Sequence, residues 1–170
     1  MNVEIVHTQN QDITEIFKLY DDAIAYQKEV GNNHWLGFEE SLVQTEINER
    51  RHFKMMAKGE LVGTFCIAYS DAAIWQFANE TSAIYIHRIA ASKNSRGLHL
   101  VKHIVDWAKT FAGEHGISYI RMDTGSGNDR LINYYIRCGF SFLGDTSVAW
   151  SPGLPAHYQN GSFALLEMHI

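Results

Sequence analysis

The sequence predicts a mixed α/β fold in a single domain over residues 1–170, and three observations predict it. A chain of 170 residues with 46% hydrophobic content is large enough to bury one core without disulfides. Residues 82–123 have the pattern strand, amphipathic helix, strand, which is the β-α-β unit that pairs parallel strands. Residues 52–69 hold two strand-like runs around Lys58-Gly59-Glu60, a tight hairpin signal.

The N-terminal third predicts a strand followed by two helices. Residues 2–7 are apolar and β-branched, and Asp12, with Glu15 three positions later, is typical of a helix start. Residues 39–50 predict a second, more polar helix. The turn-rich segment 31–38 between the helices carries aromatic residues. These aromatic residues either flank a binding groove or, as is more common, pack onto the domain.

The C-terminal part predicts a short helix between strands. Asn128 is suited to cap this helix, and Gly139 stands where a left-handed glycine ends one. Residues 140–150 and 163–170 are strand-like. The expected sheet is therefore central and mostly antiparallel, with one parallel pair and flanking helices.

Charge and composition exclude several classes of protein. The formal net charge is −5 and the sequence pI is about 6.0, so we expect neither nucleic acid nor an anionic membrane as a partner. No segment approaches the ~18 apolar residues that span a bilayer. Two scattered cysteines, Cys66 and Cys138, are typical of a reducing compartment, so we expect a cytoplasmic protein.

The loop from Ala91 to Val101 joins the strand and the helix of the β-α-β unit. Amide N–H groups at a helix start bind phosphate oxygens, Gly97 permits close approach, and Arg96 adds a positive charge. On this local pattern alone, a pyrophosphate site and a plain connection are equally expected.

The order of these motifs resembles the GNAT superfamily of N-acetyltransferases. The resemblance rests on Ser-Lys-Asn-Ser-Arg-Gly at residues 92–97 and on Tyr-Ile-Arg-Cys-Gly-Phe at residues 135–140. The resemblance is close over residues 82–140. Over nearly all of the remaining chain, only the order of the predicted helices and strands matches that of the family. The resemblance implies that the parallel strands splay apart, that acetyl-CoA is the acetyl donor, and that the chain forms a homodimer.

The resemblance also implies a cofactor site and an acid. Tyr135 would protonate the leaving thiolate of CoA, although an aromatic residue at helical spacing is more often part of a core. His99 and Val101 depart from the family, which usually has small residues there. The implied cofactor-binding residues are Ile89, Ala91, Arg96, Gly97, Leu98, His99, Leu100, Val101, Asn128 and Tyr135.

A general base is also needed, because an aliphatic amine is mostly protonated at neutral pH. Glu80, His87 and Asp123 are the candidate catalytic bases. Each also has an ordinary explanation, as a solvated carboxylate or a structural histidine. Asp71 lies in a segment that could favour a cationic amine.

We expect no metal. His99, His103 and Asp106 share a helix, but Leu100 stands where a zinc hydrolase needs glutamate. Neither cysteine has a neighbour that would make it a nucleophile, so direct transfer fits better than an acyl-enzyme.

The sequence thus predicts an acetyl-CoA-dependent N-acetyltransferase that acts on a primary amine of a small molecule or a peptide. Two alternatives stay open. One is a non-catalytic CoA-binding regulatory module, suggested by His99 and Val101, and the other is a scaffold that acts only through protein contacts.

Overall fold

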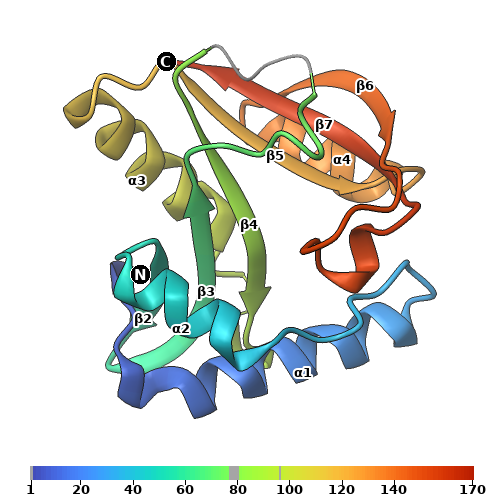
Figure 1. Ribbon diagram of the computed structural model, residues 1–170. Coiled ribbons are helices and arrows are strands. Elements are labelled where there is room, and N and C mark those ends of the chain that lie inside the picture. Colours follow the sequence, from blue (N-terminus) through green and yellow to red (C-terminus); the bar gives the residue numbers. More distant parts are fainter. Residues whose placement is uncertain (1, 77–80, 96) are drawn as a thin grey trace. The chain divides into compact units, whose positions relative to one another are not determined.

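The computed structural model describes residues 2–76, 81–95 and 97–170. The helices are α1 (Ile13–Glu29), α2 (Glu40–Asn48), α3 (Leu100–Glu114) and α4 (Asp129–Arg137), and the strands are β1 (Glu4–His7), β2 (His52–Ala57), β3 (Glu60–Ala68), β4 (Ala83–Ala91), β5 (Tyr119–Gly125), β6 (Ser141–Ser147) and β7 (Ser162–His169) (Figure 1).

The strands form one mixed sheet in the order β1-β2-β3-β4-β5-β7-β6. The pairs β1–β2, β2–β3, β5–β7 and β6–β7 are antiparallel. The pair β4–β5 is parallel, with Ala83 opposite Tyr119 and Ile86 opposite Met122. The predicted mixed α/β fold with one parallel pair is therefore confirmed.

The chain divides into two compact units. The first consists of Met1–Ile67 and Arg88–Ile104, and the second of Ala68–His87 and Val105–Ile170. A single domain over residues 1–170 stays a prediction.

In the first unit, the hairpin between β2 and β3 forms where the sequence predicts it. Ala57 pairs with Glu60 across a two-residue turn. Lys58 and Gly59 have φ angles of 53° and 79°, the left-handed conformation that such turns require at both central positions.

The core of the first unit packs α1 and α2 against the sheet. Figure 1 shows the two helices beside each other, and their apolar residues meet there. The ring centroids of Trp35 and Phe38 are 5.4 Å apart, and both rings pack against this core. These two aromatic residues of segment 31–38 therefore pack onto the domain, the commoner of the two expectations. The buried residues of this core are Ile16, Leu19, Tyr20, Val43, Ile47 and Ala90.

The predicted start of α1 lies in the right place, but Asp12 does not cap it. Asp12 is itself helical and makes no side-chain cap, because a short 3-10 turn over Asn10–Asp12 precedes the helix. Its carboxylate instead accepts a hydrogen bond from the Gln9 amide at 2.7 Å and pairs with Lys54 at 2.8 Å. The sequence pattern therefore predicts the start of α1 correctly, but its assignment of Asp12 as the capping residue is wrong.

His52 is fully buried in the first unit. Its ring nitrogens lie 2.8 Å from the Tyr20 hydroxyl and 2.8 Å from the Thr8 hydroxyl. Burial, assisted by the positive charge of Arg88, lowers the pKa of His52 to about 3. The imidazole is therefore neutral in the folded protein at physiological pH.

We expect His52 to make folding sensitive to acid. Between the unfolded pKa of ~6.5 and the folded value, the unfolded chain binds the extra proton, so stability falls as the pH falls. The slope from this residue approaches ~1.4 kcal/mol per pH unit. Denaturant unfolding of the wild type and of His52→Gln, measured at several values between pH 4 and 7, should show a shallower dependence in the variant. Parallel curves would contradict this assignment.

In the second unit, α4 has the boundaries that its capping residues predict. The Asn128 side chain accepts from the Leu131 amide at 3.2 Å, and Gly139 follows the helix with a φ of 107°. The helix packs against β6 and β7. The core of this unit contains Ile74, Trp75, Ala83, Tyr85, Val148, Phe163 and Leu165.

Among the described residues, no helix combines the length and apolar character that a bilayer span needs.

Candidate active site

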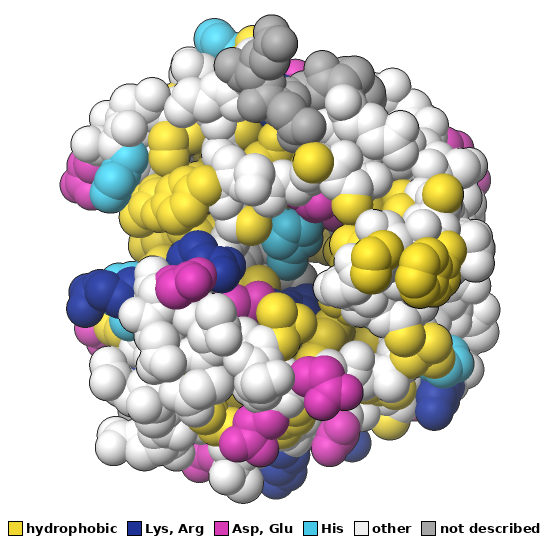
Figure 2. All heavy atoms as spheres, in the orientation of Figure 1, with side chains coloured by type: hydrophobic (Ala, Val, Ile, Leu, Met, Phe, Trp, Pro, Cys, Tyr) yellow, Lys and Arg dark blue, Asp and Glu magenta, His cyan; other side chains and the backbone are white. Residues whose placement is uncertain are grey.

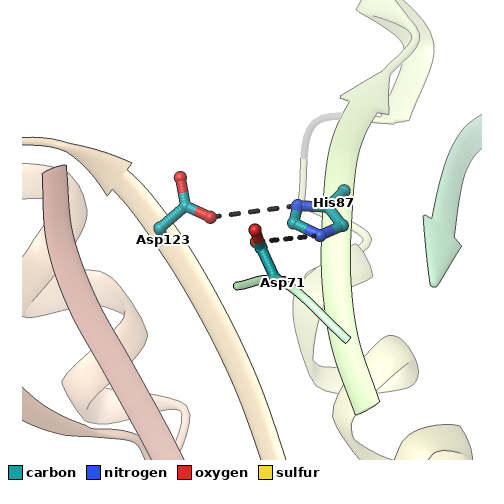
Figure 3. Close-up of side chains that lie close together, drawn as sticks. All are labelled: Asp71, His87 and Asp123. Carbon is teal, nitrogen blue, oxygen red and sulfur yellow. Dashed lines mark ion pairs between the residues drawn. The ribbon is translucent and has the colours of Figure 1, made fainter. Parts of the chain in front are cut away.

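His87 lies on β4 in the second unit, close to two carboxylates. Its Nε2 is 3.4 Å from Asp71 Oδ2, and its Nδ1 is 3.8 Å from Asp123 Oδ1 (Figure 3). The three side chains come from the segment after β3, from β4 and from β5. The exposed fractions are 16% for His87, 11% for Asp71 and 3% for Asp123. His87 is thus neither a solvated histidine nor an isolated core residue. We call these three residues the Asp-His-Asp cluster.

Asp71 is held by the short segment that follows it. Its carboxylate accepts from the Ile74 amide, and its carbonyl accepts from the Trp75 amide at 2.8 Å. Ile74 and Trp75 are buried in the core, where Trp75 packs edge-on against Tyr85. The Arg121 guanidinium lies 5.0 Å from the centre of the Trp75 ring. The position of Asp71 therefore depends on an apolar anchor.

Asp123 is the most buried member of the cluster. Its carboxylate accepts a hydrogen bond from the Tyr158 hydroxyl, while its Oδ1 has no hydrogen-bond partner among the described residues. Burial, followed by the negative charge of Asp71, raises the pKa of Asp123 to about 7. Burial also raises the pKa of Asp71 to about 6. Both carboxyl groups consequently titrate close to neutral pH.

Tyr135 is buried on α4, with Phe140 edge-on at 6.4 Å between ring centroids. Burial raises the pKa of its phenol above the ordinary value, and the negative charge of Asp123 acts in the same direction. Tyr135 is thus a protonated phenol within electrostatic reach of the cluster. A buried phenol of this kind can donate a proton but cannot easily lose one to solvent.

The predicted phosphate-binding loop lies in the first unit. Gly97 and His99 have left-handed φ angles of 82° and 50°, a conformation in which glycine is unstrained and histidine is not. His99 is exposed, whereas Leu100 and Val101 are buried, so these two can offer a ligand only their backbone. Ile89 and Ala91 lie in the same unit, on β4. Leu98 precedes His99 and is half-buried.

Two predicted site residues, Glu80 and Arg96, lie outside the described residues. The cluster brings together His87 and Asp123, both considered as bases, with Asp71. Sequence reasoning did not pair Asp71 with His87 and missed Tyr158. A sequence signal for the position of Asp71 is the apolar Ile74-Trp75 pair that anchors its segment.

The cluster also has the donor types of a metal site. One possible ligand atom from each of its three residues lies within 4.8 Å of the other two, and no other such group of His, Cys, Asp or Glu occurs among the described residues. The absence of a metal stays a prediction.

On the face in Figure 2, the Lys and Arg side chains occur in small separate groups, and no broad basic area is visible there.

Comparison with known proteins gives the family. The model of the acetyltransferase (GNAT) family matches residues 11–140. The chain is 25% identical over 142 residues to the uncharacterized N-acetyltransferase YesJ of Bacillus subtilis (strain 168), and the match covers 79% of each chain. The chain therefore belongs to the GNAT family of acetyltransferases and is an acyltransferase.

Solved structures have the same fold. A GNAT family acetyltransferase from Listeria monocytogenes 4b F2365 superposes with a TM-score of 0.78 at 24% identity, covering 99% of this chain and 95% of that one. The NatC complex bound to Gag peptide and CoA superposes with a TM-score of 0.70 at 14% identity, covering 100% and 99%. Acetyl-CoA is the donor that family membership implies.

Proposed function

We propose that this enzyme transfers the acetyl group of acetyl-CoA directly to a primary amine of a small molecule or a peptide. The observation that carries the proposal is the placement, in one unit, of a buried protonated Tyr135 within electrostatic reach of the Asp-His-Asp cluster. Direct attack on a thioester needs one group that accepts the amine proton and one that protonates the leaving thiolate. Both kinds of group are present there.

The acid in this mechanism is Tyr135. As the C–S bond breaks, negative charge develops on the sulfur, and a phenol hydroxyl placed there can stabilise this charge by a hydrogen bond and supply the proton that the thiolate takes up. The raised pKa of Tyr135 keeps the phenol protonated before the reaction. The proton then moves from the phenol oxygen to the CoA sulfur, and Tyr135 is reprotonated when the attacking nitrogen loses its second proton.

The base is the cluster that contains His87. Its carboxylates attract the ammonium form of the acceptor and favour its loss of a proton. The neutral amine attacks the acetyl carbonyl, whose oxygen is polarised in this proposal by backbone groups of Ile89 and Ala91. One well-placed donor of this kind contributes roughly 3 kcal/mol. Glu80 stays an alternative base from sequence.

The remaining parts of the proposal concern binding and context. The segment from Arg96 to Val101 binds the CoA pyrophosphate through amides at the start of α3. The enzyme acts in the cytoplasm as a homodimer, without metal, nucleic acid or membrane. Family membership favours this catalytic function over the regulatory CoA-binding module and over a scaffold.

Calorimetric titration with acetyl-CoA tests the donor half of the proposal. We expect saturable binding by the wild type. His99→Gly should bind up to about fivefold more tightly, equivalent to about 1 kcal/mol, because the substitution removes a side chain at the helix start and leaves a glycine suited to the left-handed φ. Weaker binding by His99→Gly would instead assign His99 a hydrogen bond to the phosphates.

The acceptor half is tested with a panel of primary amines and peptide N-termini, following the release of free CoA. Transfer to at least one class of amine is expected. Lack of acetyl-CoA binding by both forms would overturn the proposal, and tight binding without transfer to any amine would favour the regulatory module.

A further inference from the structure

Both ring nitrogens of His87 face carboxylates. Nε2 lies 3.4 Å from Asp71 Oδ2 and Nδ1 lies 3.8 Å from Asp123 Oδ1, the two separations that dashed lines mark in Figure 3. A histidine that takes a proton directly from its substrate needs one ring nitrogen turned toward that substrate. In this arrangement each ring nitrogen has a carboxylate oxygen nearby, and the two carboxylates also lie close to each other.

The two carboxylates are not equivalent. Asp123 is almost completely buried and lies within electrostatic reach of Tyr135, whereas Asp71 is more exposed and is followed by the exposed Ala72. Asp123 Oδ1 and Asp71 Oδ2, the two atoms that face the imidazole, have no hydrogen-bond partner among the described residues. These oxygens are therefore available to exchange protons with His87.

We propose that Asp123, His87 and Asp71 form a relay that carries the proton of the acceptor amine from the reaction site toward solvent. This inference rests on the proposed acetyl transfer and assigns Asp71 a role in it. Imidazole suits the middle position, because it can bind a proton at one nitrogen while it releases another from the opposite nitrogen.

The relay balances in three transfers. Ionised Asp123 takes a proton from the ammonium group of the acceptor, which leaves the neutral amine that attacks the acetyl carbon. Asp123 then gives this proton to His87 Nδ1, and His87 Nε2 passes its own proton to Asp71. Asp71 releases a proton to water. Before the next turnover the imidazole regains its first tautomer by exchange with water, in which Nε2 gains a proton and Nδ1 loses one.

The observed separations of 3.4 and 3.8 Å exceed hydrogen-bond lengths. Contacts of this length become hydrogen bonds through small side-chain shifts, because they exceed the usual length by less than about 1 Å. The groups around the relay are Tyr158, which donates to Asp123, and Tyr135, whose phenol stays protonated. Arg121 lies two residues before Asp123 on β5, but it is paired with Glu167 at 2.8 Å.

The test uses His87→Ala in the full chain, with the amine that the wild type acetylates best. We expect kcat to fall at least about tenfold while KM for acetyl-CoA is unchanged, because proton removal is impaired and cofactor binding is not. Imidazole added to the assay should restore part of kcat in a saturable way. Wild-type kcat should rise as the pH increases through 6 to 7, since the carboxylates accept protons only when ionised.

Variants of the other residues locate the ends of the relay. Asp123→Asn should lose about 100-fold in kcat without rescue by imidazole, because the first acceptor is gone. Asp71→Asn should lose less and stay insensitive to imidazole. His103→Ala, a histidine on α3 outside the cluster, is the matched control and should keep wild-type kinetics.

The outcomes separate the two levels of the proposal. The relay alone is overturned if His87→Ala keeps the wild-type kcat. It is also overturned if His87→Ala folds and is slow, but imidazole does not restore its kcat. Loss of wild-type activity on chelation overturns it in favour of a metal site. An inactive wild type over the whole amine panel overturns the proposed function and the relay with it.

Discussion

Tyr135→Phe should lower kcat by at least about 100-fold while acetyl-CoA still binds with wild-type affinity. The substitution removes only the hydroxyl and keeps the ring against Phe140. General acids contribute about 10²- to 10⁴-fold, and the ring itself fills the same space in both proteins. Transient kinetics that follow the release of free CoA, together with calorimetry, measure the two quantities separately.

Tyr134→Phe is the matched control. Tyr134 is the preceding residue on α4 and is only partly buried, and its ring lies 5.8 Å from that of Tyr135. Its loss should change kcat less than about threefold, on the scale of general-acid effects. Equal kcat values for the wild type and Tyr135→Phe at every pH would show that the thiolate leaves without this phenol.

The pH dependence of Tyr135 has a definite sign. Since burial raises the pKa of the phenol above its ordinary value, the acid stays protonated throughout the neutral and mildly alkaline range. Any decline of kcat below pH ~10, the ordinary phenol value, must then come from another group. Burial thus raises the pKa of both the acid and the carboxylates of this site, because it disfavours every negative charge there.

The parts of the fold that follow local rules could be predicted from sequence. The left-handed turn at Lys58-Gly59 and the Asn128 cap depend on residues close in the chain, and each has the predicted role. The failure at Asp12 has a local and a tertiary cause. Its carboxylate has several acceptor sites, and the backbone of the preceding turn and Lys54 occupy them in place of the helix amides.

The candidate site was harder to predict because it depends on tertiary packing. Alternation along β4 leaves open whether His87 faces core or solvent, and the answer depends on Asp71, which lies in a segment without regular structure. That segment is fixed by the burial of Trp75 and by the Arg121 guanidinium near its ring. Such contacts join residues far apart in the sequence and leave no spacing pattern.

A second large effect is expected in the first unit, where Arg88 is buried. Its guanidinium donates to Glu46 and lies 2.9 Å from Cys66 Sγ, with the Phe38 ring centre 4.9 Å away. The side chains of Arg88 and Glu46 are 6% and 7% exposed. Arg88 also has a φ of 51°, which costs a non-glycine residue roughly 1–2 kcal/mol. The side-chain contacts hold this strained residue directly after His87.

Arg88→Met should lower the free energy of unfolding by about 3–5 kcal/mol, because it leaves the Glu46 carboxylate buried without its cation. Glu46 Oε2 already has no hydrogen-bond partner among the described residues, so the variant would leave the whole carboxylate poorly satisfied. Denaturant unfolding at pH 7 measures the loss. Lys93→Met is the control, since its pair with Asp22 is at 3.7 Å and Lys93 is 78% exposed, and it should change stability by less than about 1 kcal/mol.

The double variant Arg88→Met with Glu46→Leu separates the charge effect from loss of packing. If the uncompensated carboxylate causes the loss, replacing it by an apolar side chain should restore most of the stability, because buried ion pairs often contribute little net free energy over apolar residues of similar size. A double variant as unstable as Arg88→Met would instead assign the loss to the sulfur and aromatic contacts of the guanidinium. Coupling of more than about 1 kcal/mol between the two positions is the expected signature of the pair.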